Sequence, residues 1–386
     1  MKKLFCLLLA LILLASSLFG CAERLPDDLM TTGSYEHRVT GLTAYDAAPW
    51  DHYILTKTYN SIYDRTTGEI VYGLCEDLEC DGSCPLDTGS AHIVGISKGR
   101  IYFSLMNREP HYGYRNILSG EVVYLLKISM EEMLPNRPMF LDGGWVYLTR
   151  KHLKEGGNPE NANDYVPYLS RIPEDGGKEE LLYAMRGNSE SLILIADGIM
   201  FTWYESKIWR TDLATWEQSI LHDLTTSEID GLSQHVYLDG YLYFDPSHAS
   251  NLPYIVRMNA TTGEWDYVLE EPVDRWIITN DTIYFLTFDD RQINDPILYP
   301  RDGEDAYIMS YAPTLYACDL DGSNVRAVWT EKTGCLDFAA SNFTVIDNAL
   351  YGWIREFDFE NNMWKDRYFA EIRFDTGEII PATVVD

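Results

Sequence analysis

The sequence predicts an all-β fold, a β-propeller of seven four-stranded blades, from three observations. Aromatic residues make up 13% of the 386 positions, which favours pleated, half-buried strands. A strand-turn-strand phrase recurs about every 40–50 residues, a period typical of propellers. No segment of useful length carries apolar residues at the helical period of 3.6, which argues against α/β alternatives.

The first half of each repeat is a turn such as Asp-Gly or Asn-Asp, followed by a strand rich in Tyr and Phe. These residue pairs tolerate positive φ and therefore favour hairpin turns. Clear copies occupy residues 99–103, 142–147, 197–201, 239–244, 280–285 and 347–351. Residues 51–55 form a degenerate first copy. The repeats therefore predict seven blades, with six or eight as the alternatives.

The second half of each repeat is a strand, a tight turn and another strand. Copies begin with the strands at residues 61–64, 168–172, 207–212, 254–258, 315–319 and 369–374, and a weak one covers residues 114–120. Each unit therefore supplies four strands. Residues 232–269 show the complete pattern most clearly.

One phrase in this body resembles known propellers. Residues 315–325 read Leu-Tyr-Ala-Cys-Asp-Leu-Asp-Gly-Ser-Asn-Val, which resembles the strand-and-turn repeat of Tol-type and YWTD-like propellers. Residues 40–386 are also similar to uncharacterised propeller lipoproteins of Gram-positive anaerobes. The resemblance implies an architecture and carries no activity with it.

The first twenty residues have the three regions of an export signal. Lys2 and Lys3 are followed by the apolar segment 4–14 and then by small residues. The segment is too short for a confident membrane span. We therefore expect residues 1–20 to form a signal peptide.

The end of this signal resembles the bacterial lipobox. It reads Leu18-Phe19-Gly20-Cys21, and in lipoproteins the peptide is cut before the Cys, whose thiol is acylated. The resemblance implies lipid attachment at Cys21, a lipidated tether over residues 21–38 and a propeller over residues 39–386. It also implies export and anchoring on the outer face of the cell membrane.

Net charge restricts the partners of the folded body. The chain has 60 Asp and Glu residues against 30 Lys and Arg, a formal charge of -30. Because cationic residues must neutralise phosphate, this balance excludes nucleic acid as a partner.

Propeller geometry sorts the connections between two faces. Loops from strand two to strand three, and from strand four to the next blade, emerge on one face, and the remaining turns emerge on the other. Unusually long loops are predicted only on the first face, at residues 106–113, 151–164, 289–311 and 357–367. Elaboration of one face points to function there.

Acidic and aromatic residues in two of these loops are the candidate ligand-binding residues. They are His111, Tyr112, Asp289, Asp290, Asp302, Asp305 and Tyr307. Carboxylates with aromatic rings suit a cation, an amine or a sugar. The alternative is a solvated insertion without function.

Three cysteines in the connection between the first two blades are a second candidate. Cys75, Cys80 and Cys84 supply most of a tetrahedral zinc site. Exported proteins more often form disulfides, so we expect one local disulfide with a spare thiol and keep zinc as the alternative. Similar lipoprotein propellers have a His in such a loop, where this chain has Asp81-Gly82. No other cofactor is expected, and the pairing of Cys318 and Cys335 is left open.

No local catalytic signature is present. The sequence lacks a Gly-x-Ser-x-Gly elbow, a His-Glu-x-x-His pair and a glycine-rich phosphate loop. We therefore predict a non-catalytic binding or interaction module for an envelope protein or a glycan. The alternative is a polysaccharide lyase or hydrolase whose catalytic residues come singly from channel-facing strands.

Overall fold

The computed structural model describes most of the predicted propeller. The described ranges are 47–56, 61–72, 91–105, 110–134, 139–159, 161–187, 189–226, 229, 232–246, 254–269, 273–279, 281–287, 297–301, 304–308, 314–330, 336–358 and 363–384. Within them, no helix is long and apolar enough to cross a membrane.

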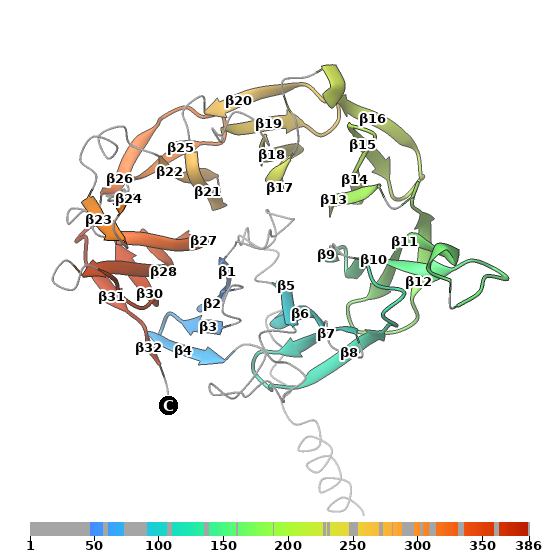
Figure 1. Ribbon diagram of the computed structural model, residues 1–386, viewed down its shortest axis with the longest axis horizontal. Coiled ribbons are helices and arrows are strands. Elements are labelled where there is room, and N and C mark those ends of the chain that lie inside the picture. Colours follow the sequence, from blue (N-terminus) through green and yellow to red (C-terminus); the bar gives the residue numbers. More distant parts are fainter. Residues whose placement is uncertain are drawn as a thin grey trace, which may run out of the picture.

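Seven antiparallel sheets form the ring in Figure 1, so the predicted fold class and blade count are confirmed. Blade 1 contains β1 (Ala47–Trp50), β2 (Tyr53–Thr56), β3 (Ser61–Asp64) and β4 (Glu69–Tyr72). Blade 2 contains β5 (Ala91–Ser97), β6 (Arg100–Leu105), β7 (His111–Asn116) and β8 (Val122–Lys127). Blade 3 contains β9 (Met139–Asp142), β10 (Trp145–Leu153), β11 (Tyr165–Pro173) and β12 (Glu180–Ala184). Blade 4 contains β13 (Ser191–Ala196), β14 (Ile199–Tyr204), β15 (Lys207–Asp212) and β16 (Gln218–Asp223). Blade 5 contains β17 (Ser233–Leu238), β18 (Tyr241–Asp245), β19 (Ile255–Asn259) and β20 (Trp265–Leu269).

Blades 6 and 7 each carry an extra element beside their four strands. Blade 6 contains β21 (Val273–Thr279), β22 (Thr282–Thr287), β25 (Thr314–Asp319) and β26 (Arg326–Thr330), and blade 7 contains β27 (Leu336–Ile346), β28 (Ala349–Asp358), β30 (Tyr368–Arg373) and β31 (Ile379–Pro381). The hairpin β23 (Ile297–Arg301) and β24 (Glu304–Ile308) is inserted in blade 6, and β29 (Met363–Trp364) pairs with β28. Two short 3-10 helices, η1 (Ala162–Asp164) and η2 (Leu224–Thr226), lie in connections.

The predicted Asp-containing turns join the first two strands of the blades. Asp197, Asp239 and Asp347 have φ values of 50°, 49° and 48°. This is the conformation that tight hairpins require and that Asp tolerates better than most residues. The turn chemistry recognised in the sequence is therefore what reverses the chain at these three inner hairpins.

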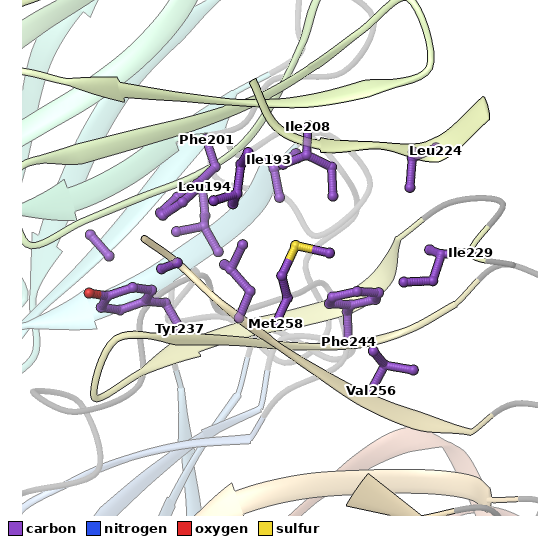
Figure 2. Close-up of a cluster of buried hydrophobic side chains, with 14 residues drawn as sticks. Ile193, Leu194, Phe201, Ile208, Leu224, Ile229, Tyr237, Phe244, Val256 and Met258 are labelled. Atoms are coloured by element: carbon purple, nitrogen blue, oxygen red, sulfur yellow. The ribbon is translucent and has the colours of Figure 1, made fainter. Parts of the chain in front are cut away.

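Apolar side chains fill the seams between blades. Figure 2 shows one such cluster, in which Leu194 and Phe201 of blade 4 face Phe244 and Met258 of blade 5. All four side chains are fully buried. Each blade presents apolar side chains on both of its sheet faces, so the ring is held together by packing from seam to seam.

A bulge recurs in the outer strand of blades 2 to 6, always opposite the third strand. The extra residue is aliphatic each time: Leu125, Leu182, Leu221, Val268 and Val328. In two seams a turn glycine of the next blade packs against the extra residue. A Cβ on Gly263 would lie 1.8 Å from the Leu221 carbonyl oxygen, and one on Gly322 would lie 1.9 Å from that of Val268.

The ring closes between blades 7 and 1. The last strand, β32 (Thr383–Val384), adds in parallel to β4 at the outer edge of blade 1. The Thr383 amide donates to the Gly68 carbonyl at 2.9 Å. Tyr63 of blade 1 packs against Phe369 of blade 7, with ring centroids 4.9 Å apart. Closure therefore combines a shared apolar core with a strand from the far end of the chain.

Candidate functional site on the long-loop face

The two faces of the ring differ in their connections, as the sequence predicts. On one face, called here the long-loop face, connections span residues 73–90, 128–138, 154–164 and 288–313. On the opposite short-turn face, inner hairpins such as 197–198 have two-residue turns, and outer hairpins have short turns such as 260–264. The face of the ring that carries the long connections is therefore established.

The predicted loop boundaries need correction. Strand β10 continues to Leu153 and β28 continues to Asp358, so both second strands reach further than expected. Residues 289–311 are not a simple loop, because they contain the hairpin β23–β24. Strands β23 and β24 are stabilised by pairing with each other. Such pairing leaves little local signal in a polar sequence.

His111 and Tyr112 lie in strand β7, and the prediction that they belong to a loop was wrong. The Tyr112 side chain is 1% exposed and packs in the apolar seam between blades 2 and 3. The His111 ring contacts Tyr124, with centroids 4.7 Å apart. Gly113 of the same strand is required by space: a Cβ there would lie 2.5 Å from the Val123 carbonyl oxygen.

Only some of the other candidate residues lie within the described part of the chain. Asp305 and Tyr307 belong to β24, with Pro300 and Leu298 as their partners on β23. Asp289, Asp290 and Asp302 lie outside the described residues, as do Cys21, Cys75, Cys80, Cys84 and Cys335. Ligand binding, lipid attachment, the disulfide and the zinc alternative therefore stay predictions. Cys318 is a buried free thiol, and among the described residues no group of three potential metal ligands is present.

The structure also reveals polar groups that bridge neighbouring blades towards the long-loop face. The most extensive group lies at the seam between blades 2 and 3. The buried Arg150 guanidinium donates to Glu132 Oε1 at 2.5 Å and to both carboxylate oxygens of Glu179, at 2.5 and 2.9 Å. Burial raises the pKa of Glu179, but hydrogen bonds from Arg150 and Ser170 outweigh it and keep that pKa below its ordinary value.

His152 extends this network along β10. Its Nε2 lies 3.8 Å from Glu179 Oε1, and its ring meets Tyr168 edge-on at 5.4 Å. Burial and the nearby Arg150 charge lower the pKa of His152. The imidazole is therefore neutral at pH 7 and packs in the seam instead of projecting from a loop.

Glu190 joins blades 3 and 4. Its buried carboxylate accepts hydrogen bonds from Thr202 Oγ1 at 2.9 Å and from the Arg186 amide at 2.6 Å. Tyr183 contributes a longer contact, from its hydroxyl to Glu190 Oε2 at 3.4 Å. This carboxylate fixes the connection between β12 and β13.

Blade 5 is bridged to both of its neighbours by polar contacts. His235 of β17 bonds through Nε2 to the Ile193 carbonyl oxygen of blade 4 at 2.7 Å, and burial lowers the pKa of this imidazole. On the other side, Trp276 Nε1 of blade 6 donates to Asp245 Oδ1 of blade 5. Burial raises the pKa of Asp245 to about 7, although the indole hydrogen bond opposes the shift.

The inner strands carry bulges at the positions of these contacts. Ile193 is the extra residue in β13, and His235 lies in the bulged part of β17. A bulge frees a carbonyl from the ladder and turns it outwards, which explains why the Ile193 oxygen is available to blade 5. Asp245 and Glu190 carried no sequence signal, because an isolated acid beside a strand looks the same whether it is exposed or buried.

Comparisons with known proteins identify the fold and leave the family open. No family model matches the chain, and no curated protein matches it. Among solved structures, an oligogalacturonate lyase from Vibrio parahaemolyticus shares 10% identity with a TM-score of 0.50, over 82% of this chain and 84% of the lyase. A prolyl endopeptidase shares 10% identity with a TM-score of 0.51, over 95% of this chain and 52% of that protein. The chain thus spans about half of that endopeptidase.

A structure assigned to TolB of Agrobacterium tumefaciens also matches, with 10% identity and a TM-score of 0.32 over 60% of this chain. At such identities the likeness concerns the fold alone.

Proposed function

We propose that the chain is a lipid-anchored extracytoplasmic propeller that binds an envelope protein or a glycan through its long-loop face, without catalysis. The observation that carries the proposal is the asymmetry of the connections, because extended loops on a rigid scaffold are where binding residues are usually placed. The Cys21 lipobox supports the membrane location, and the charge of -30 supports a partner other than nucleic acid.

Anchoring is tested by the variant Cys21→Ser in the full chain. The expected result is loss of lipid labelling and release from the membrane fraction, since the acyl chains supply the membrane affinity. Cys318→Ser is the matched control, because that thiol is buried in the ring, and it is expected to stay in the membrane. Retention of the Cys21→Ser protein would contradict the anchoring claim.

A lyase or hydrolase is the second candidate, and one observation favours it. Asp245 and His235 lie on the first two strands of blade 5, towards its long-loop end, and a carboxyl that exchanges its proton near pH 7 suits acid-base catalysis. The probe is oligogalacturonate, with the ultraviolet absorbance of unsaturated product as the readout. The binding proposal expects no product, and turnover that disappears in Asp245→Asn would replace it with the lyase.

A further inference from the structure

The hairpin tip between β14 and β15 departs from the turn chemistry of the rest of the ring. Glu205 and Ser206 form this exposed two-residue turn on the long-loop face, with φ values of 50° and 56°. The other described non-glycine residues with positive φ lie in turns of the short-turn face, and most are Asp or Asn: Asp51, Lys98, Asp197, Trp216, Asp239, Asn324, Asp347 and Asn348. Glu and Ser suit this conformation much less than Asn and Gly do.

Contacts within blade 4 hold the tip in this unfavourable conformation. The Ser206 carbonyl accepts a hydrogen bond from the Leu224 amide at 2.9 Å, and the Tyr204 carbonyl accepts one from Trp209 Nε1 at 3.3 Å. Backbone strain persists only where the surrounding structure fixes it, and it gathers at functional sites. The turn itself needs neither side chain, which points to a role for the pair outside the fold.

The tip adjoins a stack of aromatic and cationic side chains. The Arg186 guanidinium, from the connection between β12 and β13, lies 3.7 Å from the Trp209 ring centroid and 5.5 Å from that of Tyr204. Its Nη2 donates to Gln218 Oε1 at 2.7 Å. Ile220, the partner of Trp209 on β16, is 49% exposed. The tip patch, as it is called here, consists of Arg186, Tyr204, Glu205, Trp209 and Ile220.

We propose that the tip patch is the part of the long-loop face that contacts a protein partner, and that Glu205 receives a Lys or Arg side chain of that partner. Trp, Tyr and Arg dominate the energetics of protein interfaces, and the stack presents all three partly exposed. Glu205 forms no ion pair among the described residues, and Nζ of the adjacent Lys207 lies 3.8 Å from Asp223 Oδ2. The inference rests on the proposed function of this face and names its contact site.

The chemistry of the patch favours a basic protein surface over a sugar. The Arg186 guanidinium covers one side of the Trp209 ring, so a sugar cannot stack there. The Tyr204 hydroxyl forms a hydrogen bond with the Glu205 carboxylate, which raises the pKa of that hydroxyl and holds the acid beside the ring. The chain carries a formal charge of -30, which attracts a positively charged partner.

Photo-cross-linking from the patch tests the contact in cells that carry the full chain. A photoreactive phenylalanine analogue replaces Ile220, with Ala214, exposed on the short-turn face of the same blade, as the control position. We expect a cross-linked peptide of another protein from position 220 and none from position 214. Glu205→Gln should lower the yield about tenfold, and Glu217→Gln on the short-turn face should not change it. A cross-linked saccharide, or a yield that is the same in Glu205→Gln, would overturn the inference.

The double variant Glu205→Asn, Ser206→Gly separates binding from folding. Because Asn-Gly suits positive φ at both positions, the melting temperature of the full chain in detergent should rise by about 2 °C, while the cross-link from position 220 falls about tenfold. A lower melting temperature or an undiminished cross-link would show that the pair serves the fold.

The same analogue at Met130, a 51% exposed residue elsewhere on the long-loop face, distinguishes this inference from the proposed function. A product from position 130 without one from position 220 would overturn the tip patch and leave the proposed function standing. No product from either position would overturn both.

Discussion

The two faces of the ring are joined across their seams by different kinds of contact. On the short-turn face the bridges include ion pairs with exposed aspartates: Arg65 of blade 1 with Asp347 of blade 7, and Arg100 of blade 2 with Asp175 of blade 3. Lys98 of blade 2 also pairs there with the buried Glu174 of blade 3. The two aspartates are 76% and 81% exposed. Towards the long-loop face the bridges are polar groups around the buried Arg150 and Glu190 and the half-buried His235 and Asp245.

This difference determines which face responds to which condition. Exposed pairs contribute little and are screened by salt. Buried groups resist salt, but removing a partner or changing a proton has a large effect. The exposed pairs of the short-turn face are therefore expected to respond mainly to salt, and the less exposed groups towards the long-loop face mainly to the loss of a partner or to a change of protonation.

The largest effect is expected for Arg150→Met. The variant removes the buried charge that two half-buried carboxylates share, while keeping most of the side-chain volume. We expect a loss of about 3–5 kcal/mol in the free energy of unfolding, measured by denaturant titration. Arg171→Met, which breaks the more exposed pair with Glu180, is the control and should lose less than about 1 kcal/mol. Similar losses in both variants would remove the distinction between the faces.

The turn glycines give the next largest effect and separate close packing from backbone conformation. Gly263 and Gly377 have φ values of 73° and 70°, but only the first would place a Cβ against a neighbouring carbonyl. Gly377→Ala should lose about 1 kcal/mol from the positive φ alone. Gly263→Ala should lose about 3 kcal/mol, because overpacking adds to the same penalty. Equal melting temperatures for the two variants would show that the seam yields to the extra methyl group.

Asp245 supplies a pH dependence of intermediate size. The folded chain holds this proton up to about pH 7, whereas an unfolded Asp releases it near pH 4. The folded state therefore binds more protons between these values, so stability falls as pH rises from about 4 to 7 and levels off above. We expect Asp245→Asn to gain about 2 kcal/mol relative to the unmodified chain on going from pH 5 to pH 8. A difference between the two proteins that does not change with pH would contradict this assignment.

The smallest effect is expected on the short-turn face, for Asp347→Asn. Asn tolerates the positive φ of 48° at this position, so the variant removes only the charge opposite Arg65. The expected loss is about 0.5 kcal/mol at low ionic strength, and it should vanish at 1 M salt. The measurement is the difference between variant and unmodified chain at each salt concentration. A loss that persists in salt would mean that this pair is structurally more important than its exposure suggests.

The fold was predictable because turn chemistry and period are local properties of the sequence. The Asp turns and their Tyr-rich strands gave the blade count, and this count in turn sorted the connections between two faces. Closure by β32 was not predictable, since a two-residue strand that pairs with β4 has no pattern of its own.

The candidate site was predictable only at the level of a face. A glycine required by close packing, such as Gly113, and a glycine in a loop look identical in a single sequence. Asp245 and Glu190 were missed because burial arises from packing between blades, which links residues far apart in the chain. For example, Asp245 and Trp276 belong to different blades and lie 31 residues apart in the chain.

The most direct test of the functional claim compares cross-linking from the two faces in cells that carry the full chain. A photoreactive phenylalanine analogue replaces either Met130, which follows β8 on the long-loop face, or Val325, in the turn between β25 and β26 on the short-turn face; each is 51% exposed. The proposal predicts a discrete cross-linked envelope protein or glycan from position 130 and none from position 325. The same product from both positions, or a product from position 325 alone, would contradict the assignment of function to the long-loop face.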